Sequence, residues 1–304
     1  MKNKVVNMKE AVASLVKDGD TVVIEGFTHL ICFAAGHEII RQGRKDLTLA
    51  RLTPDLIYDQ MIAAGCAKKM VFSWAGNPGV GSLHAFRRAV EAKPPLLAIE
   101  EYSHFGMVAR LAAGASNLPF WPLRNYGGTD IPKVNPRIKT VKCPFTGEDL
   151  AAVPALRPNV TIIHAQRADK SGNSQIWGLM GVQKEAAFAS QRVIIVVEEL
   201  VEGEMVRADP DRTLLPGLAV DAVCVVPWGA HPSFAQGYYD RDNDFYRDWD
   251  PISRDPARLE AWLDEWVRGV PDRAAYLDKL GPETIAALRP GPRLSGAVDY
   301  GEYR

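Results

Sequence analysis

The chain has 304 residues, of which 47% are hydrophobic and 24% are charged, and its formal net charge at pH 7 is −1. This is an ordinary globular composition, and the length fits one large domain or one domain with an extension. The near-neutral charge, without a basic block, argues against a protein that binds nucleic acid or a membrane surface.

Membrane and disulfide-rich classes are also disfavoured. No run of about 18 apolar residues could span a bilayer, and the N-terminal residues carry charges where a signal peptide needs an apolar core. The cysteines are widely spaced without a CxxC pair, and they are Cys32, Cys66, Cys143 and Cys224. This spacing indicates neither a zinc site nor a disulfide framework, so we expect a cytoplasmic protein with reduced thiols.

The first hundred residues alternate between strand and helix patterns. Short apolar runs predict strands at 21–24, 47–50, 70–73 and 96–99. Apolar residues at helical spacing predict helices at 8–16, 33–42 and 55–64, and a further helix capped by Ser82. This order is typical of βαβ units, so we expect an α/β fold with an open, mostly parallel sheet and helices on both faces.

The second half of the chain is less regular. Residues 114–158 hold seven prolines and many turn residues, so we predict a long irregular loop there, and such loops are usually functional. Further strands are predicted at 160–163, 193–197 and 219–226, with a helix near 183–190.

The last part of the sequence changes character. Residues 238–250 are rich in Tyr and Asp, and 256–269 form an amphipathic helical pattern. We therefore expect a main α/β domain of residues 1–229. Residues 230–304 are expected to form a C-terminal helical arm that packs on the body or on a partner.

The stretch 159–178 has the order of a functional segment. A buried strand is followed by the polar residues HAQRAD and then by the turn residues KSGN. In open α/β sheets, ligands lie outside the carboxyl ends of the strands, so the segment stands where a site is expected.

The same residues carry a resemblance. A buried strand, then HAQRAD, then SGN, resembles the signature of the A subunit of class I coenzyme A transferases, in particular the glutaconate CoA-transferase branch. DGDTVVIEGFTH, HEIIRQGRKDLTL and EEYSHFGM resemble the same subunit in the same order. The resemblance covers roughly residues 5–230 and implies the subunit fold of that family.

The resemblance also implies a chemistry. The substrates would be an acyl-CoA thioester and a carboxylic acid, dicarboxylic or ring-derived, with no metal and no bound cofactor beyond the thioester. In the two-subunit members the nucleophilic glutamate lies on the B subunit, so this chain would be the A subunit of an A2B2 heterotetramer. Two alternatives stay open: a ring-opening CoA-thioester hydrolase with Glu101 as base, and a non-catalytic homologue that binds CoA thioesters.

Three acidic positions follow predicted strands, at Glu25, Glu100–Glu101 and Glu198–Glu199. Glu101 is the best catalytic candidate, because His104 follows three residues later and a helical turn would bring the two together. A steroid-degrading hydrolase branch that the sequence resembles has a catalytic acid in this region. The alternative is that Glu100 or Glu101 caps a helix or pairs with an arginine; the pair at 198–199 is expected to be structural.

The turn after the first strand is a candidate substrate or CoA site. Gly26 and Phe27 match a glycine-rich turn that is similar to the family's GGF, where backbone N–H groups would approach the thioester. Glu25 stands where a glycine is common. Glu25 and His29 are therefore candidate substrate selectors, and a structural role for both is equally expected.

A loop of small residues at 73–82 precedes a predicted helix. Helix N-termini attract anions, so Ser73, Gly76 and Asn77 are candidate contacts for a substrate carboxylate. A nucleotide phosphate is less expected, because the loop has neither a P-loop nor a GxGxxG pattern. Arg87 and Arg88, one turn into that helix, are expected to lie on a solvated face.

The signature segment supplies the remaining candidates. The resemblance implies that it forms the floor of the site, with Asn173 as an amide donor. The competing interpretation is that Asp169 and Gly172 hold a tight turn. The residues concerned are His164, Arg167, Asp169, Gly172 and Asn173.

Overall fold

Runs of Val, Ile and Leu form the central sheet, because branched side chains favour the extended backbone. In the computed structural model, which describes residues 2–290, the parallel strands are β1 (Thr21–Glu25), β2 (Leu47–Ala50), β3 (Ala67–Phe72), β4 (Ala98–Glu101), β8 (Val160–Asp169), β10 (Arg192–Val201) and β12 (Ala222–Val225). Their order is β12–β10–β8–β1–β2–β3–β4, with parallel pairing throughout. The predicted mostly parallel sheet is confirmed.

Two short antiparallel strands extend the sheet. They are β9 (Ser174–Gln175) and β11 (Thr213–Leu215). β9 pairs with the carboxyl-terminal half of β8 at Arg167 and Ala168, and β11 pairs with β9. β8 therefore has β1 as its neighbour at its start and β9 at its end.

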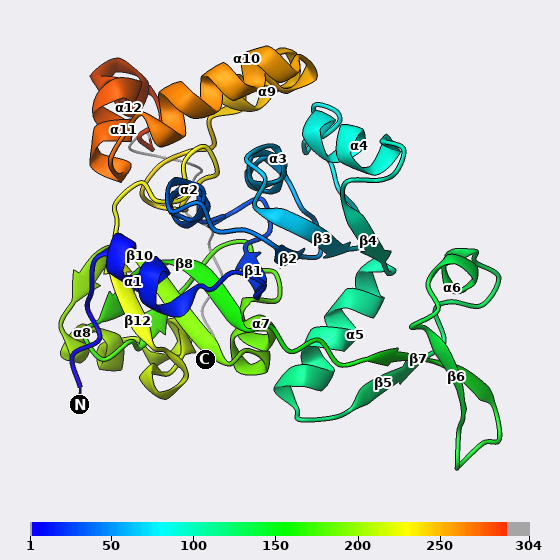
Figure 1. Cartoon of the computed structure of the whole chain (residues 1–304). Helices are drawn as coiled ribbons and strands as arrows, with labels where there is room; N and C mark the ends of the chain where they lie inside the picture. Colours follow the sequence, from blue (N-terminus) through cyan, green and yellow to red (C-terminus); the bar gives the residue numbers. More distant parts are fainter. Residues whose placement is uncertain (1, 291–304) are drawn as a thin grey trace, which may run out of the picture.

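Helices cover both faces of the sheet (Figure 1). On one face lie α1 (Met8–Leu15), α2 (Phe33–Arg41), α3 (Leu56–Ala63) and α4 (His84–Glu91). On the other lie α5 (His104–Ala115) and α7 (Gln183–Ala189). Side chains alternate between the two faces of a strand, which explains this arrangement. Val22 and Ile24 of β1 pack in the core with α1 to α4, and Val23 packs in the core with α5 and α7.

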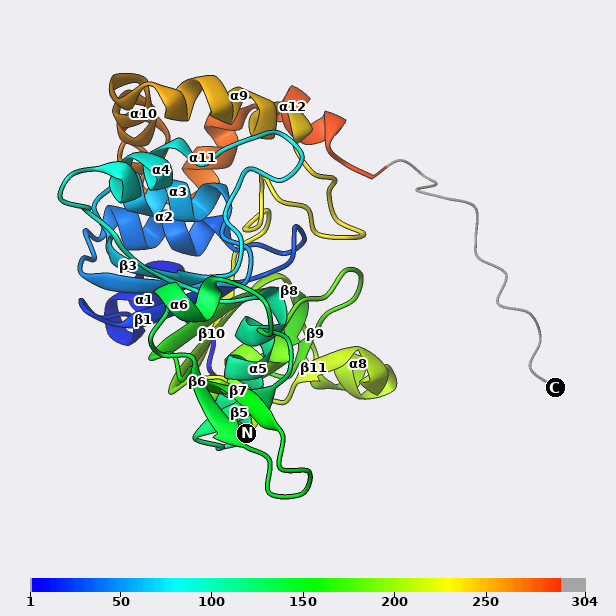
Figure 2. The same ribbon diagram turned by 90° about the vertical axis from the view of Figure 1, so that its right-hand side faces the viewer.

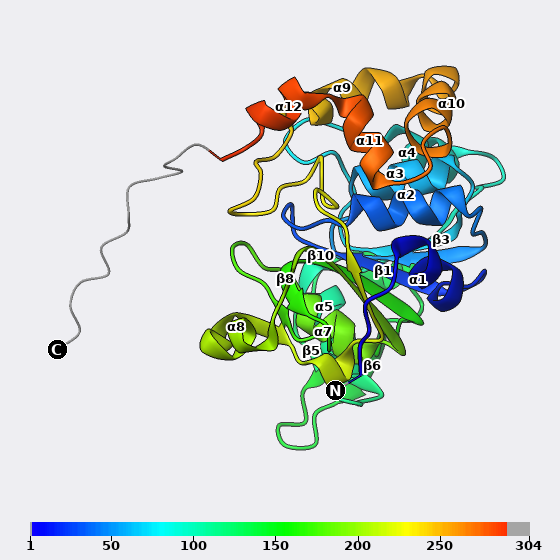
Figure 3. The same ribbon diagram turned by 90° about the vertical axis from the view of Figure 1, so that its left-hand side faces the viewer.

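The C-terminal helices form a further layer over α2, α3 and α4 (Figures 2 and 3). They are α9 (Asn243–Arg254), α10 (Pro256–Leu263), the π-helical turn η3 (Asp264–Arg268), α11 (Arg273–Leu280) and α12 (Pro282–Ala287). Trp249 and Trp262 are buried in the core under these helices, and Trp249 Nε1 donates to Asp59 Oδ2 of α3 at 3.1 Å. A domain boundary at 229/230 stays a prediction.

The prediction of a long irregular loop at 114–158 is wrong. The segment contains β5 (Phe120–Leu123), α6 (Ile131–Val134), β6 (Lys139–Lys142) and β7 (Asp149–Pro154). The strands form a separate antiparallel sheet in the order β5–β7–β6. Prolines are tolerated here because Pro122 is in an edge strand and Pro154 is the last residue of β7.

Two strand positions also differ from the prediction. β4 begins at Ala98 and not at Leu96, whose side chain is 75% exposed. The polar residues 164–169 continue β8 and are not a segment after it, because they pair with β10 as far as Asp169 and Val201. The carboxyl end of β8 therefore extends beyond that of β1.

Short helices complete the connections. They are α8 (Gly203–Ala208) and the 3-10 turns η1 (Pro210–Arg212) and η2 (Gly217–Ala219). Among the described residues, no helix has both the length and the apolar character that crossing a membrane requires.

Candidate active site

The carboxyl ends of β1, β3 and β4 bring three predicted site residues together. Phe27 follows β1, Ser73 follows β3, and His104 begins α5 after β4. His104 Nδ1 lies 3.1 Å from Ser73 Oγ, and the rings of His104 and Phe27 meet edge to face with centroids 6.1 Å apart. The site predicted at the ends of parallel strands therefore has a physical centre at these side chains.

The hydrogen bonds of Ser73 determine the tautomer of His104. The single hydroxyl hydrogen of Ser73 is donated to the carbonyl oxygen of Leu52 at 2.6 Å, and a carbonyl can only accept. The contact with His104 therefore requires that Nδ1 carries the hydrogen and donates it to Ser73 Oγ. In the neutral ring this leaves the lone pair on Nε2 of the exposed imidazole.

The carboxylate of Glu101 has no partner within the described part of the chain. It is the last residue of β4 and pairs with Phe72 of β3. Its side chain is partly exposed and makes no hydrogen bond or ion pair with residues 2–290. Its carbonyl oxygen accepts a hydrogen bond from Asn135 Nδ2 at 2.7 Å. Glu101 is thus held by its backbone while its carboxylate stays available to a ligand or a second chain.

The helical turn that would pair Glu101 with His104 does not form. β4 continues to Glu101, and Ser103 is an N-cap with extended backbone (φ −66°, ψ 160°) whose Oγ accepts from Gly106 N. Glu101 and His104 therefore flank one turn without a hydrogen bond between their side chains.

Glu100 pairs with an arginine, as the alternative to a catalytic role proposed. Strand alternation directs it to the face opposite Glu101, where Arg110 donates to it at 2.9 Å and Tyr102 at 2.6 Å. Burial raises the pKa of this carboxyl, but the hydrogen bonds from Lys69 and Tyr102 and the charge of Arg110 outweigh burial and lower it. Glu100 anchors α5 to β4.

Glu25 is buried at the end of β1, with 2% of its surface exposed. Burial raises its pKa to about 7, because the charge of Arg51 only partly offsets the loss of hydration. Arg51 is itself engaged with Asp55 at 3.0 Å and with the carbonyl of Gly26. Glu25 Oε2 has no hydrogen-bond partner among the described residues.

The loop after β9 closes over the turn after β1. A Cβ atom on Gly181 would lie 2.8 Å from Glu25 Oε1 and 3.2 Å from Phe27 Cβ, so this contact requires glycine. A Cβ on Gly26 would lie 2.7 Å from the carbonyl oxygens of His29 and Leu30. The glycine predicted to let a thioester approach thus also permits a tight turn.

His29 connects two loops from inside the protein. Nδ1 lies 2.8 Å from the carbonyl oxygen of Leu179, and Nε2 accepts from Gln236 N at 3.0 Å. Burial lowers its pKa to about 4. Both ring nitrogens are occupied and the side chain is fully buried, so the geometry favours a structural role over substrate selection.

The loop 73–82 has few free backbone donors. Ser73, Trp74, Gly76, Asn77, Val80 and Gly81 all donate their N–H groups to carbonyl oxygens of the protein. Asn77 is buried, and its Nδ2 donates to the carbonyl of Tyr246 at 2.7 Å. In the first turn of α4, Phe86 N donates to Oδ1 of Asp59 at 2.8 Å. Of the loop's predicted contacts, only Ser73 reaches the centre of the site.

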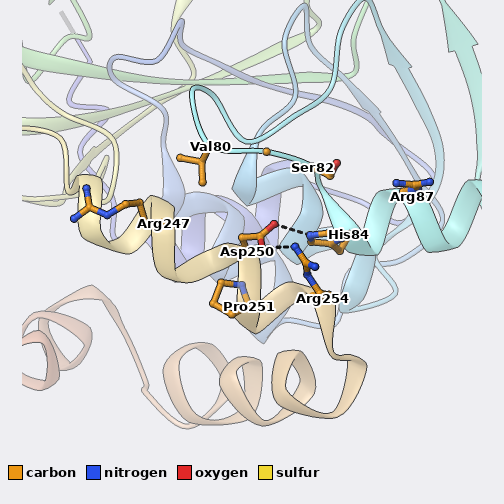
Figure 4. Close-up of a pocket in the computed structure, with 9 residues that line it drawn as sticks. Val80, Ser82, His84, Arg87, Arg247, Asp250, Pro251 and Arg254 are labelled. Carbon is orange, nitrogen blue, oxygen red and sulfur yellow. Dashed lines mark hydrogen bonds and ion pairs between the residues drawn. The ribbon is translucent and has the colours of Figure 1, made fainter.

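A cleft of about 680 Å³ lies on the outer side of this loop, between α4 and α9. His84 and Arg254 both point toward Asp250 there, at 2.8 and 2.7 Å (Figure 4). Arg87 lines the cleft and is exposed, as predicted for a solvated face. The same prediction is wrong for Arg88, which is half-buried and donates to the carbonyl of Ser253 at 2.8 Å. The lining residues include none of those that gather around His104, so this cleft is separate from the candidate site.

The signature segment forms a tight turn away from the centre. Asp169 accepts hydrogen bonds from Ser171 N and from the N and Nδ2 of Asn173, and Asn173 Oδ1 accepts from Gly217 N at 2.8 Å. Ile163, the β8 partner of Glu25, is six residues before Asp169, which corresponds to about 20 Å of strand. The structure does not bring Asn173 to the residues around His104.

Earlier in the same strand, His164 is fully buried. Its Nε2 lies 2.5 Å from Glu198 Oε1, which also accepts from Tyr239 OH at 2.6 Å. Arg167 donates to Gln175 and packs against the ring of Trp177. These contacts agree with the structural role expected for Glu198.

The residues that support the site from a distance were not predicted from the sequence. Asn135 and Asn125 lie in the segment predicted as a loop, and Gly181 lies in the loop after β9. Arg51 and Asp55 had a signal, because an arginine directly after a strand and an acid four residues later suggest an ion pair. In the structure the two side chains form a buried pair at 3.0 Å.

Four large, exposed apolar side chains lie on the segments that carry site residues. They are Trp74 at 47%, Phe105 at 53%, Leu179 at 45% and Met180 at 44% exposure. Trp74 follows Ser73, Phe105 follows His104, and Met180 precedes Gly181. Apolar residues gathered in this way are typical of a surface that another protein covers.

Comparison with known proteins gives a consistent result. Residues 5–225 match the family described as coenzyme A transferase. The chain is 57% identical over 278 residues to the A subunit of 3-oxoadipate CoA-transferase of Pseudomonas knackmussii, across 91% of this chain and 98% of that protein. It is 35% identical over 315 residues to the A subunit of glutaconate CoA-transferase of Acidaminococcus fermentans, across 98% of each.

A solved structure has the same fold over nearly the whole length. The crystal structure of glutaconate coenzyme A-transferase from Acidaminococcus fermentans aligns with a TM-score of 0.89 at 34% identity. The alignment covers 95% of this chain and 96% of that chain. The similarity thus extends past residue 225 into the C-terminal helices.

Proposed function

The chain belongs to the coenzyme A transferase family, and on that basis we propose that it is the A subunit of a two-subunit enzyme that transfers CoA from an acyl-CoA thioester to 3-oxoadipate. The observation that carries the proposal is the 57% identity to the A subunit of a 3-oxoadipate CoA-transferase across 98% of that protein. The resemblance to the A subunit of the class I transferases is confirmed by the same comparisons. They favour transfer over the hydrolase and the non-catalytic homologue.

The reaction explains why this chain needs to supply only part of the active site. In the class I mechanism, a glutamate carboxylate of the B subunit takes CoA from the thioester and releases the first acid, and the second acid then takes CoA from the enzyme thioester and restores the carboxylate. The overall exchange consumes no water and releases no proton. Groups on the A subunit would therefore hold the thioester and the acceptor, and stabilise the charge that develops during each acyl transfer.

Glu101 and His104 are the residues that we assign to this task. The carboxylate of Glu101 has no partner among residues 2–290, and Nε2 of His104 is exposed and free to accept a hydrogen or, once protonated, to donate one. Phe27 and Ser73 contact His104 and fix its position. Glu25 and Gly26 support the turn that carries Phe27.

A B subunit would complete the site from the open side. The exposed apolar residues around His104 support this arrangement, because a partner that covers them removes apolar surface from water. We propose a cytoplasmic A2B2 heterotetramer as the assembly.

Acceptor specificity tests the proposed substrate. The complex with its B subunit is assayed with acetyl-CoA or succinyl-CoA as donor and with 3-oxoadipate, glutaconate or acetate as acceptor. We expect the highest kcat/KM with 3-oxoadipate. A higher kcat/KM with glutaconate or acetate would assign the enzyme to another acid while leaving the reaction type intact.

A further inference from the structure

The antiparallel sheet β5–β7–β6 and helix α6 form a lobe, residues 120–154, that projects from the body beside α5 (Figures 1 and 2). We propose that this lobe is a docking element for the B subunit, with Phe145 at the β6–β7 tip as its anchor. The proposal rests on the proposed function, because it takes the B subunit to be the partner that completes the site.

Phe145 presents an apolar ring to solvent. Its side chain is 94% exposed, more than any other large apolar side chain in the described part of the chain. Leaving such a ring in water is unfavourable, and burying it in a partner's pocket would recover the apolar transfer free energy of a whole Phe side chain. Aromatic residues in this position are typical of interface anchors.

The tip that carries Phe145 is held in one conformation by hydrogen bonds. Cys143 N donates to the carbonyl of Glu148 at 2.8 Å, and Gly147 N donates to the carbonyl of Cys143 at 2.9 Å. Arg124 forms a forked pair with the carboxylate of Glu148. An ordered tip loses little conformational entropy on binding, which favours its use as an anchor.

The lobe is bonded directly to the turn of the candidate active site. Asn135 Nδ2 donates to the carbonyl of Glu101 at 2.7 Å. Asn125 Nδ2 donates to Ser103 Oγ at 2.6 Å, and Ser103 N donates to Tyr126 OH at 3.0 Å. The α6 side of the lobe therefore lies next to the turn of Glu101 and His104, and the β6–β7 tip extends away from it (Figures 1 and 2).

This connection selects the B subunit over a second copy of this chain. The nucleophilic glutamate of the family's B subunit has to reach the same turn, whereas a second copy has no such requirement. Two further exposed apolar side chains lie on the neighbouring helices, Phe105 of α5 at 53% and Val134 of α6 at 75%. A partner that extends from α6 to the tip would cover Val134 and Phe145 together.

The test compares two substitutions at similarly exposed apolar positions. Phe145→Asp removes the anchor, and Leu218→Asp is the matched control, because Leu218 is 86% exposed and lies on η2, which is bonded to the turn of Asn173. Analytical ultracentrifugation measures the dissociation constant between each variant and the B subunit, with circular dichroism to check folding. We expect Phe145→Asp to weaken binding at least about 30-fold and Leu218→Asp to change it less than about twofold.

A second measurement uses the wild-type chain. Hydrogen exchange of residues 143–148 is followed with and without the B subunit, and we expect slower exchange in the complex. An unchanged dissociation constant for Phe145→Asp together with unprotected tip amides would overturn the inference. It would also be overturned if Phe145→Asp abolished association between copies of this chain while binding to the B subunit stayed unchanged. If the complex protects the tip but transfers no CoA, the proposed function fails while the docking role stands.

Discussion

Ser73 Oγ lies 3.1 Å from His104 Nδ1 and donates its own hydrogen to the carbonyl of Leu52. A residue at the end of β3 thus determines which nitrogen of the imidazole at the start of α5 carries the hydrogen. Nε2 of this exposed histidine is the atom that we propose meets the substrate, and the orientation of the ring depends on one hydroxyl group.

Ser73→Ala should therefore lower kcat by about 10-fold, because the ring loses its fixed tautomer and orientation. Steady-state kinetics of the two-subunit complex measure the effect, and nitrogen chemical shifts of His104 report the tautomer. Ser73→Thr keeps the hydroxyl and should retain most of the activity. Full activity of Ser73→Ala with Nε2 still unprotonated would show that the hydroxyl is dispensable.

Glu101→Gln should lower kcat at least about 10-fold, because the amide replaces a carboxylate that has no partner among residues 2–290 and that we propose acts on the substrates. Assembly with the B subunit should be unchanged. Glu283→Gln, at an exposed position of α12, is the matched control and should have wild-type kinetics. A Glu101→Gln enzyme with unaltered kcat and KM would move the chemistry to other residues.

Glu25 should make the protein less stable as the pH rises. Its pKa is about 7 in the folded chain against 4.5 in the unfolded chain, so the folded state binds the proton more tightly. Stability from this group is complete below pH 4.5 and is lost as the pH rises through 7, by about 3 kcal/mol in total.

The comparison of wild type with Glu25→Gln isolates this effect, because other titrating groups, such as His29 with its pKa lowered to about 4, are common to both. Free energies of unfolding from urea titrations at about pH 5 and about pH 8 give the difference. We expect Glu25→Gln to gain stability relative to wild type between these two values. A constant difference at both would mean that Glu25 is ionised throughout.

Asn173→Ala should affect stability and leave substrate binding unchanged. The side chain bonds Asp169 of its own turn and Gly217 of η2, so its loss should cost about 1–3 kcal/mol of unfolding free energy. Thermal unfolding and the KM for acyl-CoA are the two readouts. A raised KM at an unchanged melting temperature would instead support the amide-donor role expected from the signature segment.

The parallel sheet could be predicted because its signals are local. Short apolar runs such as 21–24 and 47–50 are bounded by turn residues, and the helices between them have regular apolar spacing. The lobe at 120–154 could not be predicted in this way. Its strands pair across about 30 residues, as Trp121 with Val153, and its prolines favour the prediction of a loop.

The candidate site shows the same limit. Phe27, Ser73 and His104 could each be identified from the end of a strand, but their contact depends on the order in which β1, β3 and β4 lie in the sheet. The burial of Glu25 depends on Gly181, and the hydrogen bonds of His29 depend on Leu179 and Gln236. Such partners, far away along the chain, leave no pattern in the local sequence.

The most direct test of the account follows the products of a single reaction. The complex of this chain with its B subunit is incubated with succinyl-CoA, with and without 3-oxoadipate, and free thiol and new acyl-CoA species are measured together. We predict 3-oxoadipyl-CoA in an amount equal to the succinyl-CoA consumed, only when 3-oxoadipate is present, and no free thiol. Consumption of more than one succinyl-CoA per active site without an acceptor acid would contradict a transferase and identify a hydrolase, because the enzyme thioester accounts for one equivalent only.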